Sequence, residues 1–328
     1  MAERDLVVDV RGLKKYFRVR QTLFSKGYDS PWLKAVNGVS FQVSPGGTLG
    51  IAGESGCGKT TTGRMLLKLE NPTEGEYRFN GRDVTHVKRR ELRQFRRQAQ
   101  MVFQNPFEAL NPRFTVYRSL LEPLLIHGIG SRPEQEQRIN AAMERVGLKP
   151  PNTYYEKFPH QLSGGQLQRI VLARALIVDP IFIVADEPVS MLDVSVRAGV
   201  LNLMQEITAS MQLATLYISH DLSLIQYLCD DTAIMYLGQI VEMGSTDAVL
   251  ASPEHPYTQA LVAAIPVLDP ETEPPEVKIK GSVLSPIDLP EGCLFQNRCP
   301  YAERICRSEE PPLESKQSGR SVRCHVVN

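Results

Sequence analysis

A glycine-rich segment that ends in lysine and threonine constrains this sequence more than any other feature. Residues 53–60 read GESGCGKT and match the pattern G-x-x-x-x-G-K-[ST] at every fixed position. An apolar run over residues 48–52 predicts a strand before the segment, and a helical pattern follows over residues 60–69. A strand, a glycine loop and a helix in this order gather backbone N–H groups and a helix N-terminus around a phosphate. The segment therefore predicts a site for a nucleoside triphosphate.

The residues of this loop have different expected roles. In sites of this pattern the lysine, here Lys59, reaches the β- and γ-phosphates, and the hydroxyl of Thr60 binds Mg²⁺. A glycine turn that merely joined a strand to a helix would have no need of lysine and threonine at this offset. Cys57 is expected to be a non-reactive residue at a position where a small side chain suffices. The predicted cofactor-binding residues of the loop are Gly53, Glu54, Ser55, Gly56, Cys57, Gly58, Lys59, Thr60 and Thr61.

A second predicted strand ends in two carboxylates. Residues 181–185 (IFIVA) are all apolar, which is typical of a strand buried on both faces, and Asp186 and Glu187 follow directly. One acid at the tip of a strand can hold Mg²⁺, and the next can orient the water that attacks a phosphate. Asp186 is therefore the predicted metal partner and Glu187 the candidate base. Alone, two carboxylates after an apolar strand are only a moderately specific sign of a nucleotide-hydrolysing site. The glycine loop upstream makes this interpretation strong.

Strands and helices alternate along most of the chain. This alternation favours an α/β fold with a mainly parallel sheet. Residues 115–148 read as helices, and Pro133 fits the first turn of one of them. Residues 75–81 suggest a hairpin. The other predicted strands cover residues 214–219, 232–236 and 239–242, and the other predicted helices cover residues 165–178, 196–211 and 222–229.

Length and charge limit the class of protein. The chain has 328 residues, which suggests about two domains. Its 37 basic and 37 acidic residues give a formal net charge of zero, which argues against a dedicated nucleic-acid binder. The basic residues 86–100 are read as a solvated helix face, with a site for acidic groups as the alternative. No apolar run reaches the roughly 18 residues of a membrane helix, so we expect a cytosolic protein or one peripheral to a membrane.

The segment LSGGQ, residues 162–166, resembles the signature of ATP-binding cassette (ABC) ATPases. Ser163 and the amides of two glycines lie at a predicted helix start, which is a second anion-binding device. A glycine-rich helix cap is the alternative interpretation. The resemblance implies an ABC nucleotide-binding domain in which this device contacts the ATP of the opposite subunit. The residues that it assigns to that contact are Ser163, Gly164, Gly165 and Gln166.

Further motifs of the same family follow in order. Gln104 resembles the Q-loop glutamine, which senses Mg²⁺ and contacts the membrane partner, and His220 resembles the switch histidine at the γ-phosphate. Asp193 looks like the D-loop aspartate, although Met191 departs from the usual Ser-Ala-Leu-Asp pattern. An aromatic residue near the N-terminus stacks on adenine in this family, and we assign it to Phe17, with Tyr16 as the runner-up.

The remainder of the chain narrows the resemblance to oligopeptide and dipeptide importers. Residues 107–113 (FEALNPR) and 255–258 (HPYT) look like those of their ATP-binding subunits, and the insertion near residues 21–31 looks like the F-type subunit. We therefore expect an ABC ATPase domain over residues 1–250, with an antiparallel β subdomain and a helical subdomain at about 105–165. A small cysteine-bearing C-terminal extension is expected over residues 251–328, with an extended proline-rich connection near its start.

Four of the six cysteines lie in the last tenth of the chain, at Cys293, Cys299, Cys306 and Cys324. Clustered cysteines in a cytosolic protein indicate ligands more readily than disulfides. Their spacing is not that of a zinc finger, and four thiolates can hold Zn²⁺ or a [4Fe–4S] cluster. The resemblance favours the iron–sulfur cluster, with zinc and reduced structural cysteines as alternatives.

Taken together, the resemblance implies a Mg²⁺-dependent ATPase subunit of a peptide importer. Its catalytic residues would be Glu187, His220 and Gln104, and its Mg²⁺ ligands would be Thr60, Gln104 and Asp186. The implied partners are a homologous D-type ATPase subunit, two transmembrane permeases and, indirectly, a solute-binding protein. The resemblance places this protein itself at the cytoplasmic face of the cell membrane, as a peripheral subunit. Nickel, glutathione or a sugar-like solute is the alternative cargo. A non-transport ABC ATPase that works on DNA or ribosomes is the alternative class.

Overall fold

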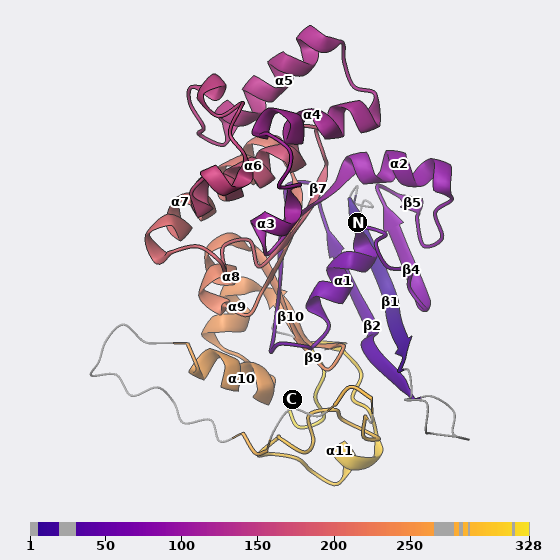
Figure 1. Cartoon of the computed structure of the whole chain (residues 1–328). Helices are drawn as coiled ribbons and strands as arrows, with labels where there is room; N and C mark the ends of the chain where they lie inside the picture. Colours follow the sequence, from indigo (N-terminus) through magenta and orange to yellow (C-terminus); the bar gives the residue numbers. More distant parts are fainter. Residues whose placement is uncertain are drawn as a thin grey trace, which may run out of the picture. The chain divides into compact units, whose positions relative to one another are not determined.

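The computed structural model describes residues 6–19, 31–265, 279–281, 285–287, 289–316 and 319–327 (Figure 1). The chain divides into two units. Unit 1 consists of Met1–Val7, Val43–Gly47 and His86–Tyr217, and unit 2 consists of Val8–Gln42, Thr48–Thr85 and Ile218–Asn328. The predicted insertion, apart from residue 31, and most of the predicted proline-rich connection lie outside the described residues.

The strands of unit 1 carry its buried core. Strand β6 (Ala99–Val102) runs parallel to β7 (Phe182–Asp186), with Ala99 opposite Phe182, and β8 (Ala214–Ser219) lies on the other side of β7. Every residue of β7 and β8 is buried, as expected for a parallel sheet covered on both faces. The predicted strands 181–185 and 214–219 are therefore confirmed, the first with a shift of one residue.

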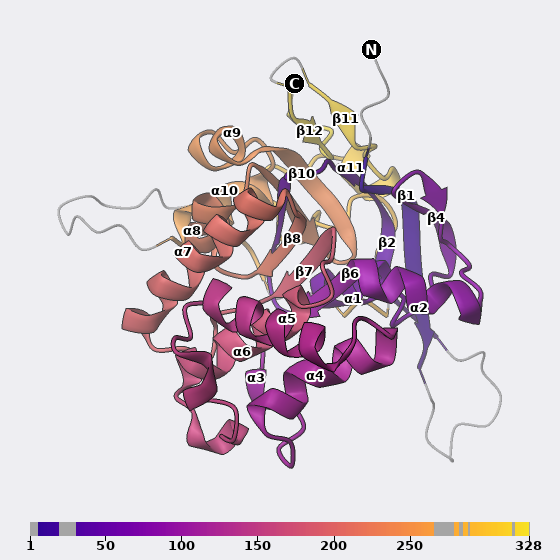
Figure 2. The same cartoon turned by 90° about the horizontal axis from the view of Figure 1, so that it is seen from above.

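Helices make up the rest of unit 1. Helices α4, α5 and α6 pack on one another in Figures 1 and 2. The sequence prediction for α5 is confirmed, because Pro133 lies in its first turn and its buried residues include Ile139, Ala142 and Met143. The exposed basic residues of α2 support the reading of this segment as a solvated face. The helices are α2 (Arg89–Gln98), α3 (Pro106–Ala109), α4 (Val116–His127), α5 (Arg132–Arg145), α6 (Gly164–Leu176) and α7 (Val194–Met211), with 3-10 turns at Pro151–Thr153 and Pro159–Gln161.

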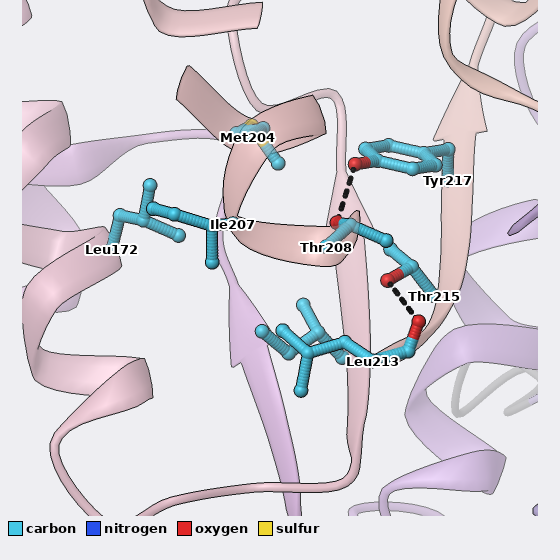
Figure 3. Close-up of a pocket in the computed structure, with 8 residues that line it drawn as sticks. Leu172, Met204, Ile207, Thr208, Leu213, Thr215 and Tyr217 are labelled. Atoms are coloured by element: carbon cyan, nitrogen blue, oxygen red, sulfur yellow. Dashed lines mark hydrogen bonds between the residues drawn. The ribbon is translucent and has the colours of Figure 1, made fainter. Parts of the chain in front are cut away.

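A small cavity lies in the core of unit 1 between α6, α7, β7 and β8 (Figure 3). Its walls are mostly apolar, and Thr208 Oγ1 lies 3.4 Å from the hydroxyl of Tyr217. The lining residues are Leu172, Ile183, Met204, Ile207, Thr208, Leu213, Thr215 and Tyr217. None of the predicted site residues lines it.

An antiparallel sheet forms one part of unit 2, as predicted. Its strand order is β2-β1-β4-β5, with β1 (Val8–Arg18) antiparallel to β4 (Glu74–Phe79), and the predicted hairpin joins β4 to β5 (Arg82–Asp83). Strand β2 covers Trp32–Val43. One prediction is wrong here. Helix α1 (Lys59–Leu66) ends three residues before the end of the predicted helix at residue 69, and Leu69 is 42% exposed.

The second sheet of unit 2 includes the end of the chain. Its strand order is β11-β12-β10-β9-β3, in which β3 (Thr48–Ala52) and β9 (Asp231–Tyr236) are parallel and the other pairs are antiparallel. Strands β11 (Glu314–Ser315) and β12 (Ser321–Val322) extend this sheet beyond β10 (Gln239–Ser245) and were not predicted. The helices of this part are α8 (Leu222–Leu228), α9 (Thr246–Ala251), α10 (Pro256–Ala263) and α11 (Ile305–Ser308).

Within the described residues, none of the helices combines the length and the apolar character that crossing a bilayer requires. The predicted boundary between an ATPase domain and an extension at residue 250 stays a prediction.

Candidate nucleotide site

The glycine loop between β3 and α1 needs glycine for space as well as for conformation. Gly53 and Gly58 have φ angles of 152° and 107°. A Cβ atom on Gly53 would lie 2.2 Å from the carbonyl oxygen of Met235, and one on Gly58 would lie 2.2 Å from that of Ala35. Gly56 has open space around it but a φ of 79°, which a residue with a side chain rarely adopts. The backbone of the loop is therefore fixed by its neighbours in unit 2.

Lys59 lies inside this loop. Its ammonium group donates to the carbonyl oxygens of Gly53 at 2.7 Å and Glu54 at 2.9 Å, and the residue is 6% exposed. Phosphate oxygens are stronger acceptors than these carbonyls, so the lysine is held where an anion can recruit it. The backbone N–H groups at the start of α1, where Thr60 is exposed, add a partial positive charge. Burial raises the pKa of the Cys57 thiol, which agrees with a non-reactive cysteine.

Two predicted catalytic residues meet at the end of β7. Gln104 Nε2 donates to Glu187 Oε2 at 2.8 Å, although the residues are 83 positions apart. Glu187 has a φ of 44°, a left-handed conformation that is unfavourable for a residue with a side chain. Asp186, directly before it, is buried. The left-handed backbone at Glu187 and the hydrogen bond from Gln104 together restrict the position of the Glu187 carboxylate.

The predicted signature and D-loop pack on each other in unit 1. Ser163 caps α6, because its hydroxyl accepts from the N–H of Gln166 at 3.3 Å, and the Gln166 side chain accepts from the N–H of Ser163 at 3.1 Å. A Cβ atom on Gly165 would lie 2.5 Å from Val196 Cγ1 of α7. Asp193 is the residue before α7. Ser163 and Gly164 are exposed, so this helix start is accessible to a ligand.

Sequence reasoning missed Arg197, which holds the D-loop in place. Its guanidinium donates to the carbonyl oxygen of Leu192 at 2.8 Å and to that of Ser190 at 3.3 Å. An arginine four residues after the D-loop aspartate, in the first turn of a helix, could have been recognised as a candidate, because the backbone carbonyls of a preceding loop lie within its reach.

The predicted switch histidine and adenine-stacking residues belong to unit 2, together with the glycine loop. His220 is exposed and follows β8. The Tyr16 hydroxyl donates to Asn37 Oδ1 at 2.6 Å. The Lys15 ammonium group lies over the Phe17 ring, 4.8 Å from its centre. Phe17 stays the predicted stacking residue, with Tyr16 as the runner-up.

Comparison with known proteins decides the family. A family model described as ABC transporter matches residues 36–190, and one described as the C-terminal region of oligopeptide/dipeptide transporters matches residues 241–306. The di/tripeptide transport ATP-binding protein DppF of Pseudomonas aeruginosa is 44% identical over 321 residues, which are 98% of each chain. The oligopeptide transport ATP-binding protein AppF of Bacillus subtilis is 42% identical over 330 residues, which are 100% of this chain and 99% of AppF. The chain belongs to the oligopeptide/dipeptide branch of the ABC transporter family.

Solved ABC cassettes share its fold. The dimeric bacterial cassette MJ0796 aligns with a TM-score of 0.63 at 24% identity, and covers 73% of this chain and 98% of MJ0796. A post-hydrolysis dimer of MJ0796 bound to ADP and phosphate gives a TM-score of 0.63 at 25% identity, with the same coverage. The predicted ABC nucleotide-binding fold, with its antiparallel β subdomain, is therefore confirmed.

The C-terminal extension of this ABC protein gathers its four cysteines without forming a ligand set. The Cys293 N–H donates to the Cys306 carbonyl at 2.8 Å. Burial and then the nearby thiols of Cys306, Cys324 and Cys299 raise the pKa of Cys293 to about 11. Four thiols in one region are suitable donors for a metal cluster. As placed, however, the described side chains contain no group of three or more His, Cys, Asp or Glu that could hold a metal ion.

Proposed function

We propose that this protein is the ATP-binding and ATP-hydrolysing subunit of an ABC importer that takes up di- or oligopeptides. The observation that carries the ATPase assignment is the contact between Gln104 and the strained Glu187. The peptide cargo is supported by the names of the relatives DppF and AppF, which align over nearly the full length. Nickel, glutathione or a sugar-like solute is the competing cargo, and uptake assays with a deletion strain separate these possibilities.

In the proposed chemistry, each group of the chain that faces ATP has its own role. Lys59 and the loop amides bind the β- and γ-phosphates, and Glu187 orients a water molecule in line with the γ-phosphate. His220 donates toward the charge that develops on the γ-phosphate oxygens. The Thr60 hydroxyl, the Gln104 amide oxygen and the buried Asp186 carboxylate are oxygen donors of the kind that Mg²⁺ prefers, and a bound Mg²⁺ would neutralise phosphate charge.

The proposed assembly pairs two cassettes. The exposed start of α6, at Ser163 and Gly164, would contact the ATP held by the glycine loop of a partner cassette. The dimer of MJ0796 bound to ADP and phosphate supports the pairing of two cassettes. The partner cassette is proposed to be a homologous D-type subunit. The two cassettes would lie at the cytoplasmic face of the membrane, bound to two transmembrane permeases, and a solute-binding protein would be an indirect partner. Closing two half-sites around ATP would move the permeases.

The test is the substitution Glu187→Gln in the complex co-purified from membranes. The variant loses the carboxylate that polarises water but keeps the phosphate contacts, so ATP binding should persist. Turnover should fall at least about 100-fold, which corresponds to about 2.7 kcal/mol of activation free energy.

The matched control is Glu144→Gln, on the exposed surface of α5, which should retain wild-type turnover. Near-normal hydrolysis by Glu187→Gln would refute the role of Glu187. A wild-type complex that does not hydrolyse ATP would refute the proposed function as a whole.

We also propose a metal centre in the extension, with a [4Fe–4S] cluster preferred to zinc. Its support is the gathering of Cys293, Cys299, Cys306 and Cys324 in one region. The arrangement of the thiols does not form a ready ligand set, so loading the centre would require the side chains to move together.

A further inference from the structure

The C-terminal extension holds the second residue of the nucleotide loop by an ion pair. Arg298 Nη1 lies 2.8 Å from Glu54 Oε2, and Arg298 Nη2 lies 2.9 Å from Glu54 Oε1. The two parallel hydrogen bonds form the bidentate geometry that is strongest for arginine and carboxylate. The Arg298 side chain is 8% exposed and that of Glu54 is 29% exposed. The pair is therefore largely shielded from water, although the residues are 244 positions apart.

A second contact from the same region fixes the backbone of Glu54. Its N–H donates to the hydroxyl of Tyr257, in α10, at 2.9 Å. The Tyr257 ring lies against Phe295 and Tyr236, with ring centres 5.5 and 4.7 Å away. The Arg298 guanidinium lies 5.7 Å from the centre of the Tyr236 ring and 5.8 Å from that of Phe295. One aromatic cluster thus positions both groups that hold Glu54.

The charge of Glu54 makes this pair consequential for nucleotide binding. A loop that receives a triphosphate gains from positive charge, and an uncompensated carboxylate in it would repel the ligand. Arg298 cancels that charge. Because Arg298 is buried and Glu54 is only partly exposed, removing the arginine would leave an uncompensated and incompletely solvated carboxylate beside the phosphate site.

We propose that Arg298 and Tyr257 are positioning residues, through which the C-terminal extension sets the affinity of the glycine loop for ATP. The inference rests on the proposed ATP site and goes beyond it, because it gives the extension a role in nucleotide binding. By linkage, ATP binding stabilises the docked extension to the same extent.

The test is a double-mutant cycle on the complex, with Kd for ATP measured by titration without hydrolysis. Arg298→Ala should raise Kd about tenfold, because the Glu54 carboxylate is left uncompensated. Glu54→Gln in the Arg298→Ala background should return Kd to within about threefold of wild type, because the repelling charge is gone. The KM for ATP should follow Kd. Arg304→Ala, an exposed arginine of the same extension, is the matched control and should leave Kd unchanged.

Rescue by Glu54→Gln is a readout that a merely structural role of Arg298 would not produce. A wild-type Kd in Arg298→Ala, or a loss that the second substitution does not restore, overturns the inference. If Arg298→Ala fails to fold, the variant Tyr257→Phe replaces it as the test. This substitution removes only the hydroxyl that accepts from the Glu54 N–H, and it should raise Kd for ATP about threefold. An unchanged Kd in this variant overturns the inference. Failure of the wild-type complex to bind ATP would instead overturn the proposed function.

Discussion

At the scale of single residues, Gly165 illustrates how little space separates the signature helix from α7. A Cβ atom added there would lie 2.5 Å from Val196 Cγ1. Gly165→Ala should therefore lower the free energy of unfolding by about 1–3 kcal/mol, the usual cost of overpacking. In a Val196→Ala background the clashing methyl group is absent, so the same substitution should cost much less. Denaturant titrations of the two single variants and the double variant measure this coupling.

Gly199 provides the control for Gly165. It lies within α7, and the nearest atom to a Cβ there is an Arg169 nitrogen at 3.8 Å, an ordinary contact. Gly199→Ala should thus stabilise the protein by about 0.5–1 kcal/mol through helix propensity. Equal destabilisation by both glycine substitutions would contradict the steric explanation.

At the scale of elements, helix α10 begins with a buried histidine as its cap. His255 Nδ1 accepts from the N–H of Tyr257 at 3.0 Å, and burial lowers the pKa of His255 to about 3. In the unfolded chain its pKa is about 6.5. As the pH falls below about 6.5, the unfolded state binds a proton that the folded state excludes. The contribution of His255 to stability should therefore decrease by up to about 1.4 kcal/mol per pH unit down to pH 3.

A comparison with His255→Asn isolates this effect, because asparagine is a good cap that does not titrate. The Glu242 carboxylate accepts from the backbone N–H of His255 at 2.9 Å, and the charge of Arg323 also lowers the pKa of His255. Both groups are present in the wild type and in the variant, so their own titration largely cancels when the two unfolding free energies are subtracted. The wild type minus variant difference in unfolding free energy should fall between pH 7 and pH 4.5, and a difference that does not change with pH would contradict the prediction.

At the scale of the whole molecule, the strands and helices that could be predicted from the sequence are those that a local residue pattern determines. The strand at 214–219 and helix α5 followed from an apolar run and from a proline at a first turn. The two-residue strands β11 and β12 have no such pattern, because their pairing depends on a distant edge. The family resemblance identified Gln104, and the apolar strand that ends in two carboxylates identified Glu187, but neither pattern predicted the contact between them. The pair of Glu54 and Arg298 could not be predicted, because no pattern links positions 244 residues apart.

The extension also provides the last prediction, which concerns metal content. Over the described residues from Cys293 to Cys324, the regular elements are the four-residue helix α11 and the two-residue strands β11 and β12. A metal centre would therefore contribute much of the folding energy of this segment. Anaerobically purified protein should contain about four iron and four acid-labile sulfide per chain and absorb visible light. Cys306→Ser should abolish both, whereas Cys229→Ala, a buried cysteine outside the extension, should retain them. One zinc per chain in a colourless protein would favour the zinc alternative, and no metal would refute the centre.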